Sequence, residues 1–176
     1  NVVQLKVKVR RLEPAPDVPF VPTSEEVVRR MLQIAKVKSG DTVFDLGAGD
    51  GRILIIAARE FNAKAIGVEI KKDFVLNIEK KIRELELEDR VSIIHGNFFN
   101  VNISKADVVT MFLLESVNER IRPKLERELK PGTRVVSHEF KVLGWKPNYF
   151  ERFTCSDGST HDLYLYVMPP EKDSKK

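Results

Sequence analysis

A glycine-rich turn between a strand-like segment and a helical segment constrains this chain most. The turn follows the apolar segment 42–46 and precedes the helical segment 53–61, and with its flanks it reads Phe44-Asp45-Leu46-Gly47-Ala48-Gly49-Asp50-Gly51-Arg52. Glycines at such a turn let a ligand approach the backbone closely, and ligands of parallel sheets bind beyond the carboxyl ends of the strands. A dinucleotide fingerprint would need glycine where Arg52 stands, and Asp45 would repel a pyrophosphate. The turn therefore predicts a ligand with a positive amino group and no phosphate.

Strand-like and helical segments alternate along most of the chain. Apolar runs of strand length lie at 42–46, 65–70, 91–95, 107–113 and 133–140, and helical spacing marks the segments between them. Two further strand-like runs, 149–155 and 161–168, are joined by a short polar turn, which is typical of a hairpin. The pattern predicts a single-domain α/β fold with a Rossmann-like, doubly wound and mostly parallel sheet that ends in a C-terminal antiparallel hairpin.

Two local signals refine the helices. Thr23 and Glu26 have the spacing of a capping box, which predicts that Thr23 caps the helix that follows. Pro123 is expected in the first turn of the main helix before the fifth strand, because a proline in a helix interior costs about 3 kcal/mol.

The ends of the 176-residue chain differ from its middle. Residues 1–18 form an N-terminal extension in which apolar and basic residues alternate from Val2 to Val9, as in a strand. The domain itself spans 19–168, and 169–176 are a polar tail that we expect to be frayed.

Composition excludes several classes of protein. The net charge of +4, with 32% charged residues of both signs, does not indicate a surface that coats nucleic acid. The single cysteine, Cys155, excludes an internal disulfide framework, and no apolar run has the length of a membrane span. The three histidines lie in different strand regions without metal-ligand spacing, so the sequence predicts no metal site. We expect a cytoplasmic monomer that contacts neither membrane nor nucleic acid directly.

Further polar residues follow the second and third strands. Glu69, followed by Ile70, ends the second strand, where a carboxylate accepts the two hydroxyls of a ribose. Asn97 and Phe98 follow the third strand and offer an amide and a ring to an adenine. With Asp45 and the backbone of Gly47, Ala48 and Gly49, these residues predict a site for an amino acid joined to a ribose and an adenine, which is S-adenosylmethionine.

The chain resembles the small seven-strand (class I) protein-lysine methyltransferases. These are the broad-specificity archaeal enzymes and their mitochondrial relatives that modify an ATP synthase c-subunit and the adenine nucleotide carrier. The resemblance covers roughly residues 19–167 and rests on Pro19-Phe20-Val21-Pro22-Thr23, the glycine-rich turn, Gly67-Val68-Glu69, Pro123-Lys124-Leu125-Glu126-Arg127-Glu128-Leu129, Arg134-Val135-Val136-Ser137-His138 and Trp145. One departure is Asn97, where the family often has aspartate.

The resemblance implies that 19–168 is a methyltransferase domain of class I fold, with S-adenosylmethionine as cofactor, that methylates exposed lysines on a broad range of proteins. It also implies that Phe20 and Val21 wall a channel for the lysine and that Phe20, Val21 and Thr23 close the methionine end of the cofactor site. Phe112 and Leu113 at the end of the fourth strand are expected to complete that channel, with an ordinary core role as the alternative. Glu115 is a candidate proton relay, with a helix-start acid as the alternative.

Two other functions remain open at this point. One is an RNA or small-molecule methyltransferase on the same fold, and the other is a non-catalytic module that uses the fold for binding. An apolar channel favours a lysine acceptor, because a free lysine has a pKa of about 10.4 and must lose its proton before it accepts a methyl group.

Overall fold

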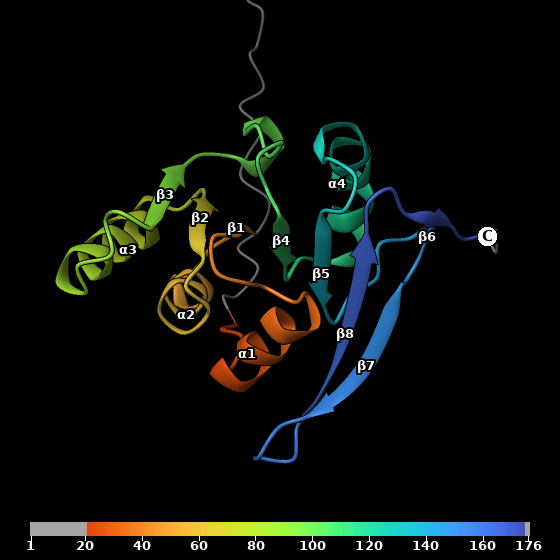
Figure 1. Ribbon diagram of the computed structural model, residues 1–176, viewed down its shortest axis with the longest axis horizontal. Helices are drawn as coiled ribbons and strands as arrows, with labels where there is room; N and C mark the ends of the chain where they lie inside the picture. Colours follow the sequence, from red (N-terminus) through yellow and green to blue (C-terminus); the bar gives the residue numbers. More distant parts are fainter. Residues whose placement is uncertain (1–20, 175–176) are drawn as a thin grey trace, which may run out of the picture.

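A seven-stranded sheet runs through residues 21–174, the part of the chain that the computed structural model describes (Figure 1). The spatial order is β3-β2-β1-β4-β5-β8-β7. The pairs among β1 to β5 are parallel, and β8 is antiparallel to both β5 and β7. This confirms the predicted parallel sheet with a C-terminal hairpin. The strands are β1 (Thr42–Leu46), β2 (Lys64–Glu69), β3 (Val91–His95), β4 (Val108–Met111), β5 (Arg134–His138), β7 (Tyr149–Thr154) and β8 (Thr160–Val167).

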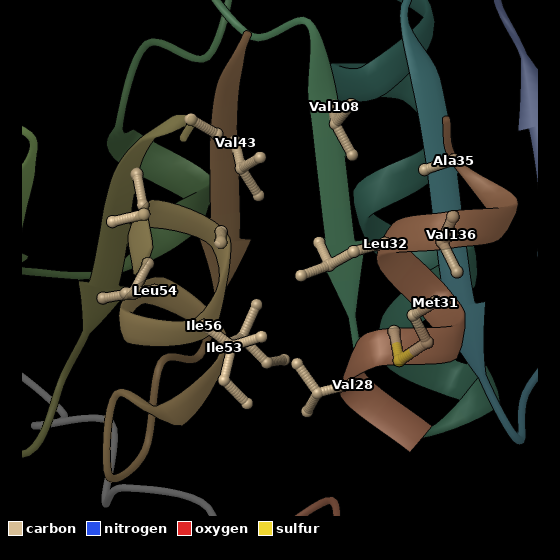
Figure 2. Packing of buried hydrophobic residues seen from close by; sticks show 14 of the residues in the cluster. Val28, Met31, Leu32, Ala35, Val43, Ile53, Leu54, Ile56, Val108 and Val136 are labelled. Atoms are coloured by element: carbon tan, nitrogen blue, oxygen red, sulfur yellow. The ribbon is translucent and has the colours of Figure 1, made fainter. Parts of the chain in front are cut away.

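Helices cover both faces of the sheet, as a doubly wound fold requires. Val43 faces a cluster built with α1 (Glu25–Ile34), α2 (Arg52–Phe61) and α3 (Lys72–Glu84), part of which Figure 2 shows. The next residue, Phe44, faces the second cluster, which includes α4 (Glu115–Glu128) and packs against the short helix η1 (Phe98–Asn100). Successive side chains of a strand point to opposite faces of the sheet, and here helices bury both faces. The short strands are therefore continuous apolar runs in the sequence.

The capping residue of α1 differs from the prediction. Ser24, not Thr23, is the N-cap, and its hydroxyl accepts a 3.3 Å hydrogen bond from the amide of Val27. Glu26 does not reach back to close a capping box; its carboxylate accepts 3.1 Å hydrogen bonds from the amide and hydroxyl of Ser156 in the hairpin turn. The tertiary contact therefore replaces the local one, and Thr23 is free to face the site described below.

Pro123 also lies elsewhere than predicted. It is the ninth residue of the 14-residue helix α4, well inside the helix. Ile121 and Leu125 flank it and are fully buried in the second cluster. Packing on both sides of the proline holds α4 continuous, because most helical stability in proteins comes from tertiary packing rather than from propensity.

The predicted polar tail is partly ordered. Glu171–Lys172 forms β9, which pairs antiparallel with β6 (Trp145–Lys146) in a separate two-stranded sheet. The Lys172 ammonium also lies 2.6 Å from a carboxylate oxygen of Glu126 on α4. The expectation that the tail is frayed is therefore wrong for these residues.

The strand-like alternation at 2–9 lies outside the described residues. Within residues 21–174, no helix combines the length and hydrophobicity that a membrane crossing requires.

Candidate active site

A cavity of about 440 Å³ lies at the carboxyl ends of β1, β2 and β4. Its polar wall comes from β1, β2 and the glycine-rich turn, which contribute Asp45, Glu69 and Asp50. Its apolar wall comes from the segments that follow β4 and β5. The volume is that of a pocket for a small molecule. The arrangement therefore places charged groups and an apolar surface around one ligand-sized space.

The glycine-rich turn is held tightly on β2. Gly47 has φ +86°, which L-residues with a side chain rarely adopt, and the amides of Gly47 and Ala48 both donate to the Val68 carbonyl at 2.9 and 3.0 Å. A Cβ on Gly67 would lie 2.8 Å from the Ala48 Cβ and 2.6 Å from a methyl group of Leu54. The absence of side chains at 47 and 67 thus lets the turn pack directly against the second strand beneath the cavity.

Glu69 is fixed between the turn and the loop after β2. One carboxylate oxygen accepts a 2.9 Å hydrogen bond from the Gly49 amide, and the other accepts a 3.0 Å bond from the Lys71 amide. The side chain is buried at the cavity wall. Each oxygen keeps a further lone pair, so this carboxylate has acceptor capacity left for two hydroxyls.

Asp45 is a buried acid at the tip of β1. Burial raises its pKa from 3.8 to about 7; the Thr110 hydroxyl, which donates to it at 2.9 Å, opposes that rise, and the neighbouring Glu69 and Asp50 add to it. Within residues 21–174 it forms no salt bridge. A cation bound beside Asp45 would restore its ionised form, because an opposite charge favours a carboxylate.

A charged clamp ties the turn to the segment before α1. The Arg52 guanidinium pairs with the Asp50 carboxylate at 2.5 Å and donates a 2.9 Å hydrogen bond to the Thr23 carbonyl. Both charged residues line the cavity. From sequence, Arg52 served only to exclude a dinucleotide site, and this second role was missed. The contact joins residues 29 positions apart, which no local pattern signals.

The cavity wall includes many of the predicted site residues but not all. On the wall are Val21, Thr23, Asp45, Gly47, Ala48, Gly49, Glu69, Phe112 and Leu113. Ile70 is exposed, and Glu115 is an exposed first residue of α4; neither lines the cavity. Phe20 lies outside the described residues. The binding and catalytic roles of all these residues stay predictions.

The predicted adenine contacts also lie off the cavity wall. The Asn97 side chain accepts a 2.9 Å hydrogen bond from the Phe99 amide and so caps η1. Phe98 packs against the second core cluster. Their role toward an adenine stays a prediction.

The apolar wall is larger than the sequence indicated. Leu114, Val117 and Phe140 line the cavity beside Phe112 and Leu113. Phe112 also stacks on His138, with 4.2 Å between ring centroids. Phe140 was missed because it follows β5, outside the motifs around β1 to β4. This side of the cavity offers a surface that disfavours a charged group.

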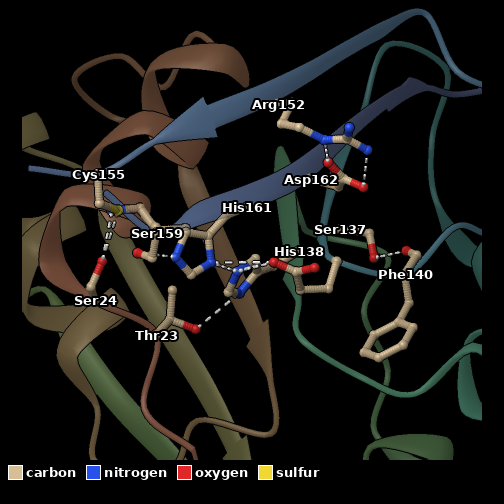
Figure 3. A network of polar contacts seen from close by, with 12 residues as sticks. Thr23, Ser24, Ser137, His138, Phe140, Arg152, Cys155, Ser159, His161 and Asp162 are labelled. Carbon is tan, nitrogen blue, oxygen red and sulfur yellow. Dashed lines mark hydrogen bonds and ion pairs between the residues drawn. The ribbon is translucent and has the colours of Figure 1, made fainter. Parts of the chain in front are cut away.

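Two of the three histidines meet, contrary to the expectation that they are scattered. His138 ends β5 and His161 lies on β8, and their rings are joined by a 2.9 Å contact between Nε2 and Nδ1 (Figure 3). Antiparallel pairing of β5 with β8 brings the two rings together, and that pairing could not be read from the spacing of 23 residues.

Comparison with known proteins identifies the family. A model of the ANTKMT methyltransferase domain matches residues 45–149, more than half of the chain. The chain belongs to the ANTKMT methyltransferase family. The matched segment contains the glycine-rich turn, Glu69, and the apolar wall from Phe112 to Phe140.

Both a near and a more distant relative are lysine methyltransferases. A protein-lysine N-methyltransferase of Saccharolobus islandicus (strain REY15A) is 56% identical over 159 residues, which is 89% of this chain and 98% of that protein. The adenine nucleotide translocase lysine N-methyltransferase of Mus musculus is 30% identical over 138 residues, which is 78% of this chain and 60% of that protein. The chain therefore spans nearly the whole of the first relative but less than two thirds of the second.

A solved structure confirms the class I methyltransferase fold. The crystal structure of an RNA methyltransferase from Salinibacter ruber, in complex with S-adenosylhomocysteine, superimposes with a TM-score of 0.81. It is 42% identical, and the match covers 88% of this chain and 97% of that chain.

Proposed function

We propose that this member of the ANTKMT methyltransferase family transfers methyl groups from S-adenosylmethionine to lysine ε-amines of proteins. The 56% identical relative, which this chain matches over nearly its whole length, is a protein-lysine N-methyltransferase. The more distant mouse relatives, which are named for the c-subunit of ATP synthase and for the adenine nucleotide translocase, are also lysine methyltransferases. Lysine methylation is therefore the activity common to these relatives.

The observation that carries the proposal is the pair of acids at neighbouring strand tips. Asp45 and Glu69 line one cavity, on either side of a turn whose residues Gly47 and Gly49 have no side chain to block a ligand. Asp45 lacks a cationic partner in the described residues, and its raised pKa is what a site for a positive amino group would have before the ligand binds. The residues present thus fit S-adenosylmethionine.

Each residue has a proposed part in holding the cofactor. Asp45 binds the amino group, the turn backbone lies along the methionine, and Glu69 accepts hydrogen bonds from the ribose hydroxyls. When bound, S-adenosylmethionine supplies a methyl group activated by a sulfonium. The Arg52 clamp holds the segment at Thr23 against the cavity, which keeps the methionine end covered.

The apolar wall acts on the lysine. A lysine ammonium with a pKa near 10.4 needs about 4.6 kcal/mol to lose its proton at pH 7. Phe112, Leu113 and Phe140 form a surface that offers the ammonium no hydrogen bonds, so the neutral amine is relatively favoured there. Activity on a lysine substrate is therefore expected to rise with pH toward 9 under single-turnover conditions.

A labelling experiment tests the proposal directly. The protein is incubated with radiolabelled S-adenosylmethionine and a lysine-rich protein, and the modified residues are mapped by mass spectrometry. We expect mono- to trimethyl-lysine and strong loss of labelling with Asp45→Asn. Surface variant Lys146→Gln, remote from the cavity, is the matched control. Label on residues other than lysine would contradict the proposal.

RNA is the second candidate substrate, because the 42% identical Salinibacter ruber protein is an RNA methyltransferase. The same labelling of a whole-cell extract, treated with ribonuclease or with protease before the enzyme is added, separates the two. Label that survives ribonuclease and disappears with protease supports protein methylation; the reverse result supports RNA.

The finer features of the function are also proposals. A broad range of substrate proteins is expected from the resemblance of residues 19–167 to the broad-specificity lysine methyltransferases. We propose that the enzyme works as a monomer in the cytoplasm; its single cysteine fits a reducing compartment. Light scattering at assay concentration tests the monomer, and labelling of only one lysine in a whole proteome would contradict the broad range.

A further inference from the structure

Three side chains behind the cavity wall bring their ligand atoms together. The Nε2 atom of His138 lies 2.9 Å from the Nδ1 atom of His161. One carboxylate oxygen of Glu139 lies 3.4 Å from the first nitrogen and 3.2 Å from the second. The three atoms thus form a nearly equilateral triangle at the end of β5, and Figure 3 shows the two rings and their polar neighbours.

The outer neighbours of His161 determine which of its nitrogens carries the proton. The Ser159 hydroxyl donates a 2.6 Å hydrogen bond to the Asp157 carboxylate, and this bond, the largest cause, lowers the pKa of Asp157. Because the Ser159 hydroxyl has only one proton and gives it to Asp157, its oxygen can only accept toward His161. The Nε2 atom of His161 therefore donates to Ser159 across 3.0 Å. In the neutral ring, Nδ1 therefore presents a lone pair to His138 and Glu139.

With the His161 ring neutral in this tautomer, no proton lies between the Glu139 carboxylate and that lone pair. The Nε2 atom of His138 can donate its proton to Nδ1 of His161 across 2.9 Å. The Glu139 oxygen, 3.2 Å from the same Nδ1 atom, then faces a second acceptor. The Glu139 backbone is held at φ +69°, rare for a residue with a side chain, and its amide donates to the Asp162 carbonyl at 2.7 Å. A cation between the three atoms would satisfy all of them.

The triangle has the dimensions of a metal site. In a tetrahedral site with ligand distances of 2.0–2.1 Å, neighbouring ligand atoms lie about 3.3 Å apart. The three separations here, 2.9, 3.2 and 3.4 Å, bracket that value. Both rings also have the outer contact that orients a metal-bound histidine: His161 to Ser159, and Nδ1 of His138 to the Thr23 hydroxyl at 3.3 Å.

Burial and charge suit a bound ion. His138 is buried at the end of β5, so its ring nitrogens are shielded from water that would compete with an ion. The side chains of Glu139 and His161 are 35% and 21% exposed, which gives an ion a route in and leaves space for a water as a fourth ligand.

We propose that His138, Glu139 and His161 bind a divalent transition-metal ion, with Zn²⁺ as the preferred probe. Two imidazoles and one carboxylate are a ligand set for zinc, whereas Mg²⁺ prefers oxygen ligands in an octahedral arrangement. The ion would join the end of β5 to β8. Because His138 contacts both Thr23 and Phe112 on the cavity wall, the ion would also stiffen that wall.

Metal titration of the tag-free, full-length protein tests the site. We expect one Zn²⁺ per chain by calorimetry, no uptake of Mg²⁺ at the same concentration, and a higher melting temperature with Zn²⁺ than with a chelator. Co²⁺ in place of zinc gives the visible absorption of a tetrahedral site, a readout that is independent of methyl transfer.

Variants make the test specific. Glu139→Gln and His161→Ala are each expected to weaken Zn²⁺ binding at least tenfold, and Ser159→Ala, which removes only an outer contact, by roughly 10–100-fold. His95→Ala is the matched control, because His95 is the remaining histidine of the three in the chain and it contacts the Ile70 carbonyl instead. Circular dichroism and S-adenosylhomocysteine binding check that each variant folds.

Two results would overturn the proposal. One is Zn²⁺ binding no tighter than Mg²⁺ binding to the unmodified protein. The other is unchanged Zn²⁺ affinity in folded Glu139→Gln and Ser159→Ala, which would place the ion elsewhere. Neither result depends on methyl transfer. The test of the metal site is therefore independent of the test of the proposed function.

Discussion

Asp45 and Thr110 lie directly opposite each other on the paired strands β1 and β4, and the Thr110 hydroxyl donates a 2.9 Å hydrogen bond to the Asp45 carboxylate. Both side chains are buried, so the bond is shielded from water. It acts against the rise in the Asp45 pKa that burial causes. The cavity therefore contains an acid whose ionised form burial disfavours and one neighbouring hydroxyl favours.

Removing that hydroxyl is expected to weaken cofactor binding. Thr110→Val raises the pKa of Asp45 further, and loss of a buried hydrogen bond to a charged group costs about 1.5–3 kcal/mol. S-adenosylhomocysteine affinity at pH 7 should fall at least tenfold by calorimetry. Thr133→Val is the matched control, because the Thr133 hydroxyl is equally buried but donates to the Ala106 carbonyl, outside the cavity. Equal effects of the two variants would count against this role of Thr110.

Cofactor affinity is expected to depend on pH through Asp45. A positive amino group binds the ionised carboxylate, and the pKa of Asp45 in the free protein is about 7. Affinity should therefore fall as pH decreases below 7, by up to tenfold per unit, and level off above pH 8. Binding near pH 6.5 should also release a proton, measurable by calorimetry in buffers of different ionisation enthalpy. Asp45→Asn should abolish both effects, and a pH dependence that persists in this variant would assign it to another group.

The same acid is expected to destabilise the ligand-free protein at high pH. Its folded pKa of about 7 lies above the ordinary 3.8, so the folded state binds the proton more tightly and stability falls as pH rises between these values. Asp45→Asn should therefore raise the free energy of unfolding at pH 8 by an amount on the order of 1–4 kcal/mol. The gain should vanish near pH 4 in urea unfolding curves. A variant that is less stable than the parent at pH 8 would contradict the assignment.

Two ligands separate the parts that Asp45 and Glu69 play. S-adenosylhomocysteine and 5′-methylthioadenosine both contain the ribose and the adenine, but only the first contains the amino acid part. Asp45→Asn should weaken binding of the first ligand and leave the second unchanged. Glu69→Gln should weaken both, by at least tenfold, because its carboxylate faces the ribose in the proposed site and loses a charge-assisted bond. Calorimetry measures the affinity of each variant for each ligand. Any other pattern among these four affinities would contradict the roles proposed for Asp45 and Glu69.

The sheet and the polar side of the cavity were predictable from sequence because each feature is local. The turn that contains Gly47 lies between a strand and a helix, and Glu69 ends the next strand. Parallel strands bring such ends to one edge of a sheet. The parallel pairing and the hairpin at residues 149–167 followed from segment lengths and turn residues in the same way.

The features that were missed all depend on contacts between distant segments. Glu26 binds Ser156 across 130 positions instead of closing a capping box, and Arg52 binds the Thr23 carbonyl. His138 meets His161 only because β5 and β8 pair. Local sequence patterns do not depend on such distant partners. From residue spacing alone, Thr23 was therefore predicted as the helix cap, and the histidines were predicted to lie apart.

Replacing Pro123 is expected to stabilise the protein. Pro123 is inside α4, where it cannot donate the backbone hydrogen bond that the helix pattern requires, and an interior proline is about 3 kcal/mol less favourable than alanine. Proline also restricts the unfolded chain, which offsets a part of that difference. Pro123→Ala should therefore raise the free energy of unfolding by about 1–2 kcal/mol in guanidinium chloride. Glu119→Ala, an exposed position on the same helix, is the control and should change stability by less than about 0.5 kcal/mol. A destabilised Pro123→Ala would mean that α4 needs the proline ring for its packing between Ile121 and Leu125.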